Sequence, residues 1–167
     1  MNLIVTVGPG GASLDWGAGA RRAAIGPGGI AIKGGEGDGI TPRGLFPVRE
    51  VFYRADRMPA PRTQLLLRAI QQDDGWCDAP GDPNYNRLVK LPYRASTENM
   101  WREDHLYDLV AVLGYNDDPV VPGKGSAIFL HLAKPDYSAT QGCVALAKDD
   151  LLAAIEQLKP GDQIAIG

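Results

Sequence analysis

The chain has 167 residues, a hydrophobic content of 44% and a formal net charge of −3. This length allows a proper buried core and predicts a single domain over residues 1–167, with no apolar segment long enough to cross a membrane. No cluster of Lys and Arg could follow a phosphate backbone, which argues against nucleic acid as a partner. The 21 glycines and 13 prolines favour many turns, and therefore a mainly β fold, over long helices.

Short apolar or alternating runs separated by Gly and Pro turns predict β-strands, in the manner of a meander or barrel. In chain order these strands are expected at residues 3–7, 13–16, 22–25, 29–33, 45–53, 63–69, 108–114, 126–132 and 163–166. Residues 71–87 are rich in Asp, Gly, Pro and Asn, which predicts a long surface loop. Residues 148–158 carry apolar side chains at helical spacing with acids in the first turn, which predicts a helix that ends before Pro160 and Gly161.

One histidine and one cysteine lie in a pattern that suits nucleophilic chemistry. His131 ends an apolar run, and a loop then leads to Cys143, which follows Gly142. A free cysteine with a pKa of about 8.5 is only a few per cent thiolate at neutral pH, and a nearby imidazole raises that fraction by accepting the proton. The backbone amides at Gly142 and Cys143 are candidate donors to a developing oxyanion.

Each of these residues also has a simpler interpretation. A lone cysteine is more often a small buried hydrophobe, and a lone histidine at a strand end is more often a hydrogen-bonded structural residue. The combination favours catalysis, because residues between the two, such as Pro135, Asp136 and Ser138, mark a loop, where chemistry is usually carried. Neither cysteine belongs to a CxxC pattern, so no metal ion or other cofactor is expected.

The segment resembles the active-site motif of the YkuD-type L,D-transpeptidases, cysteine enzymes that remodel peptidoglycan. Their pattern is a histidine, a loop, then Ser/Thr-His-Gly-Cys, followed two places later by Asn or Arg. This chain matches it at His131, Thr140, Gly142 and Cys143. Two departures indicate a divergent branch: Gln141 stands where the family has a second histidine, and the position two after Cys143 is Ala.

A second match lies upstream. Thr41-Pro42-Arg43-Gly44-Leu45-Phe46 is similar to the Thr-Pro-x-Gly-x-Phe segment of the same family, although alone it would indicate only a tight turn before a strand. The resemblance spans most of residues 30–150. It implies a β-sandwich or barrel with one C-terminal helix packed near the cysteine loop.

The resemblance also implies a mechanism and a set of roles. Cys143 would attack a carbonyl of a peptidoglycan stem peptide and form a thioester, with His131 as acid and base, and an amine from a second stem would complete a cross-link, of a type that can be atypical. The backbone carbonyl of Leu132 would orient His131, so no Asp partner is required. His105 is a less favoured alternative base. The candidate substrate-binding residues are Thr140, Gln141, Tyr115, Asn116, Trp101, Tyr85 and Asn86.

Two other functions and the location stay open at this stage. The same site would act as a carboxypeptidase or endopeptidase if water were the acceptor, and a catalytically silent wall-binding module is the third hypothesis. A papain- or NlpC-like hydrolase fits less well, because there the cysteine precedes the histidine. The expected partners are stem peptides, with the glycan strand as a further candidate, and the expected state is a monomer. The first ten residues show no signal-peptide pattern; the resemblance implies the periplasm, whereas a soluble recycled wall peptide would place the substrate in the cytoplasm.

Overall fold

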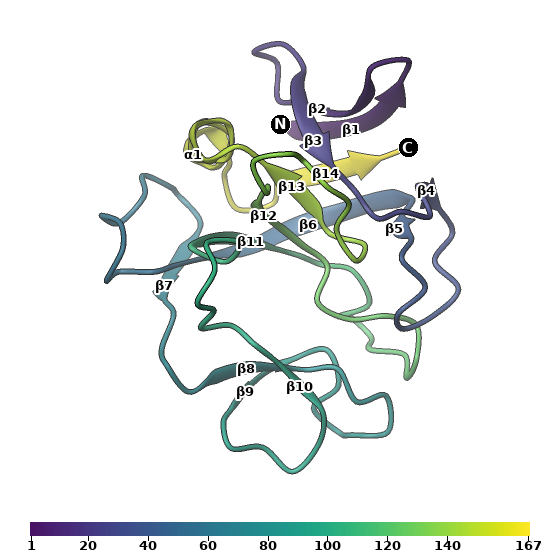
Figure 1. Cartoon of the computed structure of the whole chain (residues 1–167), viewed down its shortest axis with the longest axis vertical. Helices are drawn as coiled ribbons and strands as arrows, with labels where there is room; N and C mark the ends of the chain where they lie inside the picture. Colours follow the sequence, from purple (N-terminus) through teal and green to yellow (C-terminus); the bar gives the residue numbers. More distant parts are fainter.

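The computed structural model describes residues 1–167 as a closed β-barrel, a small second sheet and one helix (Figure 1). The elements are β1 (Asn2–Gly8), β2 (Gly11–Asp15), β3 (Arg21–Ala24), β4 (Ile30–Ala31), β5 (Thr41–Pro42), β6 (Gly44–Tyr53), β7 (Leu66–Ala69), β8 (Asp74–Cys77), β9 (Leu88–Lys90), β10 (Thr97–Asn99), β11 (Leu109–Leu113), β12 (Phe129–Leu132), β13 (Val144–Leu146), α1 (Lys148–Gln157) and β14 (Gln163–Ile166).

The main sheet has nine strands in the order β11-β12-β13-β3-β2-β1-β14-β6-β7. Because β11 also pairs with β6, the sheet closes on itself and leaves β7 alongside β6. Closure removes the exposed strand edges that an open sheet would present. The mainly β prediction with one helix near the C-terminus is therefore confirmed, and the barrel is the form that the sheet takes.

The chain has two separate clusters of buried side chains, and β11 shows why. Leu109, Ala111 and Leu113 belong to the larger cluster inside the barrel, whereas Val110 and Val112 belong to a smaller cluster outside it. Successive residues of a strand point to opposite faces, so β11 is buried on both sides. The smaller cluster lies between the outer face of the barrel and the sheet β10-β8-β9, which Figure 1 shows below the barrel.

The prediction of a surface loop at residues 71–87 is wrong at β8, whereas residues 78–87 do form turns and bends without a strand. Residues of β8 are buried throughout, and β8 pairs with β9 and β10 on either side. Trp76 packs edge-on against Phe129 of the barrel, with ring centroids 5.1 Å apart. The polar residues here have partners within the chain: Asp74 accepts a hydrogen bond from Lys90, and the buried Asn86 side chain accepts one from the Trp76 indole.

The helix α1 is separated from β13 by the single residue Ala147 and ends one residue earlier than predicted. Leu151, Ala154 and Ile155 are buried in the barrel cluster, and the helix packs on β11 and β12. Asp149 and Asp150 lie in its first turn, where carboxylates interact favourably with the helix dipole. No helix of the structure is long and apolar enough to span a membrane.

Candidate active site

The strands β12 and β13 place His131 and Cys143 on the same side of the sheet. The two strands pair in parallel, with Leu130 opposite Val144 and His131 opposite Ala145. Leu130 and Val144 point into the barrel, so the alternate positions His131 and Cys143 project from its outer face. Both line one cavity of about 450 Å³ between the barrel and the small sheet. The structure thus brings the two predicted residues to a common site.

The Cys143 sulfur is held by the backbone of the segment before β12. Its Sγ lies 3.1 Å from the Ala127 carbonyl oxygen, and the Phe129 N–H donates to Sγ over 3.4 Å. Ala127 has a φ of 54°, an unusual conformation for a residue with a side chain, and its N–H donates to the Asn86 side-chain oxygen. Asn86 therefore fixes the carbonyl that accepts the thiol proton.

The His131 ring is fixed in the way that the resemblance implies. Its Nδ1 lies 2.9 Å from the Leu132 carbonyl oxygen, and a carbonyl can only accept, so Nδ1 carries the proton. The other ring nitrogen, Nε2, is then the free acceptor. The Leu132 N–H donates to the Leu106 carbonyl, so the orienting residue is itself held in place.

Burial keeps both groups neutral in the free protein. Desolvation lowers the pKa of His131 to about 4, against a smaller opposing effect of the Leu132 hydrogen bond. Desolvation raises the pKa of the Cys143 thiol to about 12, and the Glu98 carboxylate adds to the rise. The expected resting thiolate is therefore not present at neutral pH. A neutral thiol has to give its proton to a base as it attacks, and His131 is the neutral imidazole in the same cavity.

Thr140 shapes the turn that presents the cysteine. Its hydroxyl donates to the Cys143 carbonyl over 2.7 Å and accepts the Gly142 N–H over 3.1 Å. The prediction that the Gly142 amide holds an oxyanion is not supported, because Thr140 already takes that N–H. The Cys143 N–H has no acceptor within the protein and is the better candidate. Gln141 is exposed at the cavity wall.

Gly142 is required for a different reason, which also explains the upstream motif. It has a φ of 130°, and a Cβ there would lie 2.8 Å from the Ile40 carbonyl oxygen. At Gly26, a Cβ would lie 2.1 Å from the Gly39 oxygen and 3.1 Å from Gly142 Cα. The backbone at Gly26, at residues 39–40 and at Gly142 is therefore packed so closely that no side chain fits between the three segments. Thr41 joins them, because its buried hydroxyl accepts the Gly26 N–H over 2.9 Å.

Five residues predicted to bind substrate do not line the cavity: Tyr85, Asn86, Trp101, Tyr115 and Asn116. The two asparagine side chains are buried and form hydrogen bonds with backbone groups. Asn86 Nδ2 donates to the carbonyls of Tyr115 and Asn116, and Asn116 Nδ2 donates to those of Val121 and Gly125. This prediction is corrected: buried amides with all their partners inside the chain are not available to a ligand.

The aromatic members of that set also have internal partners. Tyr115 donates to the Lys124 carbonyl over 2.6 Å, and Tyr85 donates to the Glu36 carboxylate. Trp101 lies under the Arg54 guanidinium, 3.5 Å from the ring centroid. These hydroxyls and this ring therefore hold loops in place, and no local sequence pattern separates that role from a position on the cavity wall.

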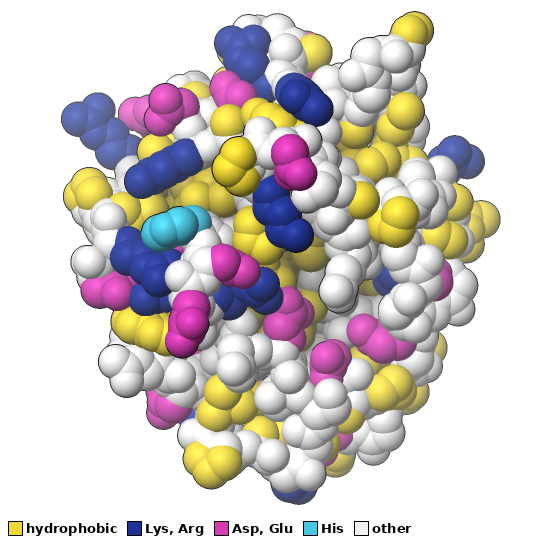
Figure 2. Space-filling model, viewed as in Figure 1, with side chains coloured by type: hydrophobic (Ala, Val, Ile, Leu, Met, Phe, Trp, Pro, Cys, Tyr) yellow, Lys and Arg dark blue, Asp and Glu magenta, His cyan; other side chains and the backbone are white.

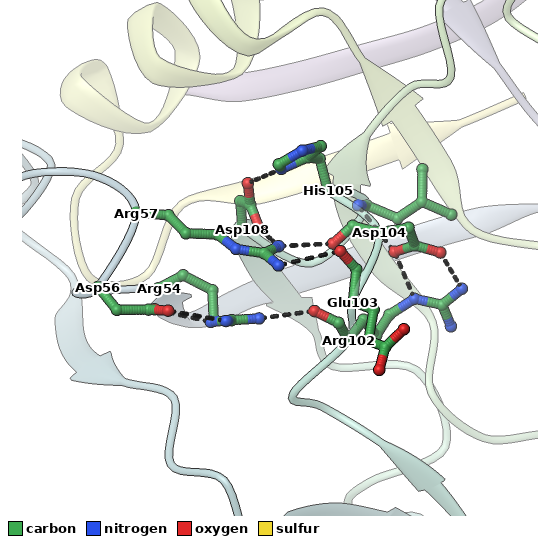
Figure 3. Close-up of polar contacts among 9 residues, drawn as sticks. Arg54, Asp56, Arg57, Arg102, Glu103, Asp104, His105 and Asp108 are labelled. Carbon is green, nitrogen blue, oxygen red and sulfur yellow. Dashed lines mark hydrogen bonds and ion pairs between the residues drawn. The ribbon is translucent and has the colours of Figure 1, made fainter.

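A network of charged side chains holds the segment that forms one cavity wall (Figure 3). Arg54 donates to Asp56 and to the Arg102 carbonyl, and Arg57 donates to Asp108 and to the carbonyls of Glu103 and Asp104. His105 is 79% exposed and lies 2.7 Å from Asp108, away from the cavity. The structure therefore disfavours His105 as the base.

The cavity carries charges of both signs that the sequence did not single out. Glu36, Asp78 and Glu98 line it, as do Lys33, Arg102 and Lys134. Lys33 is paired with Asp38 over 2.5 Å, and Arg102 with Asp104 over 2.6 Å, so two of the three cations are neutralised from outside the cavity. Figure 2 shows acidic and basic side chains around a recess on this face. These residues come from segments far apart in the chain, and no local pattern marks them.

The sequence matches the model of the YkuD family, described as the L,D-transpeptidase catalytic domain, over residues 7–166. The chain therefore belongs to the YkuD family, which confirms the resemblance drawn from its two motifs. Searches of curated proteins and of solved structures found no significant match. YkuD-family membership supports an L,D-transpeptidase-type enzyme related to peptidoglycan.

Proposed function

We propose that this chain is a peptidoglycan L,D-transpeptidase that joins stem peptides through a Cys143 thioester. The observation that carries the proposal is that Cys143 and His131 both lie on the outer face of the barrel and line one cavity, in a chain of the YkuD family. The orientation of His131 by the Leu132 carbonyl supports it further, because this leaves Nε2 free to accept a proton.

The first step transfers an acyl group to the enzyme. The Cys143 sulfur attacks the carbonyl carbon of a stem residue, typically a diamino acid, and its proton passes to His131 Nε2 as the carbon–sulfur bond forms. The Cys143 N–H, which has no acceptor within the protein, stabilises the oxyanion. The carbon–nitrogen bond then breaks, His131 returns the proton to the leaving amine, and a thioester is left.

The second step transfers the acyl group to an amine of another stem. The amine attacks the thioester carbon and gives a proton to His131, and the sulfur leaves with that proton as Cys143–SH. A new amide forms, so atoms and charge balance over the two steps. Such a substrate places the protein in the periplasm, where it is expected to work as a monomer on stem peptides and the attached glycan strand.

Hydrolysis is the second candidate function. Acidic and basic side chains line the cavity, and charged groups attract water as well as an amine. Water in place of the amine would make the protein an L,D-carboxypeptidase or endopeptidase. The same cysteine and histidine serve both reactions, so only the products separate them.

The test uses the purified chain with defined muropeptides that differ in stem length, followed by mass spectrometry. Cross-linked dimers together with a covalent carbapenem or muropeptide adduct on Cys143 would support the transpeptidase. Products that are only shortened would favour the hydrolase. Loss of both in Cys143→Ala, at unchanged thermal stability, is expected. Equal binding to peptidoglycan by wild type and Cys143→Ala, without any product, would favour the silent wall-binding module.

A further inference from the structure

Three consecutive residues just before β12 are each held by a side chain from another part of the chain. Their hydrogen bonds, each 3.0 Å long, run from the Gly125 N–H to the Tyr85 hydroxyl, from the Ser126 hydroxyl to the Glu36 carboxylate, and from the Ala127 N–H to Asn86 Oδ1. The last of these bonds bears on the proposed reaction, because the Ala127 carbonyl contacts the Cys143 sulfur over 3.1 Å. One residue that the sequence assigned to substrate therefore supports the group that contacts the proposed nucleophile.

The backbone of Ala127 has a conformation that needs outside support. Its φ of 54° lies in the left-handed region, which residues with a Cβ rarely adopt. Such a conformation persists only where the surrounding structure fixes it. The hydrogen bond to Asn86 supplies this support at the N–H of the same residue whose carbonyl contacts the sulfur. Without that bond, Ala127 would relax toward ordinary φ values and its carbonyl would move.

The Asn86 side chain is itself fixed, because all of its hydrogen-bonding groups have partners. It is 5% exposed, and its Oδ1 accepts the Trp76 indole N–H over 2.9 Å as well as the Ala127 N–H. Its Nδ2 donates to the carbonyls of Tyr115 and Asn116 over 2.9 Å and 2.8 Å. Two donors face the oxygen and two acceptors face the nitrogen, so only one orientation of the amide satisfies them.

The sulfur of Cys143 is held by backbone groups and not by the imidazole. The thiol donates to the Ala127 carbonyl, and the Phe129 N–H donates to Sγ over 3.4 Å. The structure has no hydrogen bond between Sγ and the His131 ring, whose Nδ1 is bonded to the Leu132 carbonyl. A thiol has one proton, so this proton has to leave the Ala127 carbonyl before His131 can accept it.

We propose that Asn86 is a positioning residue of the acyl-transfer reaction, which acts through the Ala127 peptide to place the Cys143 sulfur and the carbonyl at which the thiol proton rests before attack. The inference rests on the proposed function, because it takes Cys143 as the nucleophile. Its physical basis is that reacting atoms have to be held close to the productive geometry, and a displacement of about 1 Å lowers a rate about 10²-fold.

The first measurement is the S–H stretching frequency of Cys143 in the infrared spectrum of the wild-type protein. A thiol that donates to a carbonyl absorbs at a lower frequency than a thiol without an acceptor. Subtracting the spectrum of Cys143→Ala separates this band from that of Cys77, the second free thiol. We expect the wild-type band below that of an alkyl thiol in an apolar solvent. A band at the reference frequency would overturn the proposal.

Two variants of Asn86 separate its action on Ala127 from its general support of the fold. Asn86→Ala removes the acceptor, so the S–H band should move to higher frequency and product formation per folded molecule should fall about 10²-fold. Asn86→Asp, when protonated, retains an oxygen for the Ala127 N–H and a donor for one carbonyl, so band and rate should stay near wild type. Equal shifts in both variants, or a shift in neither, would overturn the proposal.

Two further variants serve where Asn86→Ala does not fold and where loosening has to be recognised. Ala127→Gly keeps the N–H that binds Asn86 and tolerates the positive φ, so the S–H band should not move. A shift would mean that packing of the Ala127 Cβ holds the carbonyl, which would overturn the proposal. Asn84→Ala makes the matched change at an exposed position two residues earlier, where Nδ2 donates to the Tyr93 hydroxyl. Band and rate should both stay at wild type, and a change in either would indicate a loosened loop and overturn the proposal.

The infrared measurement needs no muropeptide, so its result is independent of the proposed function. A chain that makes no cross-links but shows the lowered, Asn86-dependent S–H band would overturn the transpeptidase and retain the placement of the sulfur by Asn86. A chain that makes cross-links but has the same S–H band in wild type and Asn86→Ala would overturn the role of Asn86 alone.

Discussion

The two faces of the β12 and β13 pair carry different kinds of residue. Leu130, Leu132, Val144 and Leu146 point into the barrel and are almost completely buried among aliphatic side chains. Phe129, His131, Cys143 and Ala145 point outward, toward the small sheet and the cavity. The same short strands thus stabilise the fold with one face and position the proposed chemistry with the other. Substitutions on the two faces should separate stability from activity.

The largest effect is expected on the outer face. His131→Ala removes the proposed acid and base, and the rate of product formation from muropeptides should fall about 10²- to 10⁴-fold, the usual contribution of general acid–base catalysis. Because the side chain is buried and hydrogen-bonded to the Leu132 carbonyl, the rate has to be expressed per folded molecule. Activity is measured by product analysis and stability by the midpoint of thermal unfolding. Wild-type activity in a folded His131→Ala protein would exclude His131 from catalysis.

The neighbouring residue on the inner face should behave in the opposite way. Leu130 is 0% exposed, and Leu130→Ala would leave a cavity inside the barrel. The free energy of unfolding should fall by about 2 to 5 kcal/mol, as for other large-to-small changes in a core. The folded fraction should retain its rate per molecule. Chemical denaturation and activity measured on the same preparation check this, and a small stability loss with a large loss of rate would contradict the division between faces.

The division between faces also explains what the sequence could and could not predict. The strands at β1, β6, β11 and β14 were predicted close to their observed bounds, because apolar runs between turns are a local signal. The same signal is missing at β8, where Asp74 and Gly75 break the apolar pattern, although all its residues are buried. That strand is stabilised by packing of Trp76 on Phe129, which no local pattern contains.

The candidate site shows the same limit. Cys143 and His131 were predicted because a Gly-Cys turn after a strand is visible in the sequence. Glu98 and Tyr107 were missed as cavity residues, because their place in the cavity depends on the small sheet lying against the outer face of β12. Asn86 and Asn116 were assigned to substrate, since polar residues in Gly- and Pro-rich segments look exposed, yet both are buried in hydrogen bonds with backbone.

The burial of His131 should be visible in the pH dependence of stability. Its folded pKa of about 4 lies below the unfolded value of 6.5, so the unfolded chain binds more protons between these values. The stability contribution is complete above pH 6.5 and is lost as the pH falls toward 4. The loss amounts to about 3 kcal/mol, because one pKa unit corresponds to about 1.4 kcal/mol.

This dependence can be measured as the difference between variants. Unfolding free energies of wild type and His131→Gln between pH 4 and pH 7 should diverge, with the wild type losing more stability on acidification. His105→Gln makes the same change at a histidine that is 79% exposed, and should follow the wild type. Parallel curves for wild type and His131→Gln would mean that His131 is not held neutral on the outer face.

The smallest loss of stability is expected for a substitution in the turn directly before Cys143. Gly142→Ala places a methyl group 2.8 Å from the Ile40 carbonyl oxygen and requires a φ of 130°, which residues with side chains rarely adopt. We expect a stability loss of about 1 to 3 kcal/mol, the cost of such backbone strain. Activity should fall by more than this loss implies, because relief of the contact moves Cys143 relative to Phe129 and Ala127. Gly161→Ala is a matched control, because Gly161 also has a positive φ, of 94°, but an added Cβ there would meet no atom within 4 Å. This variant should lose stability and keep its rate per folded molecule.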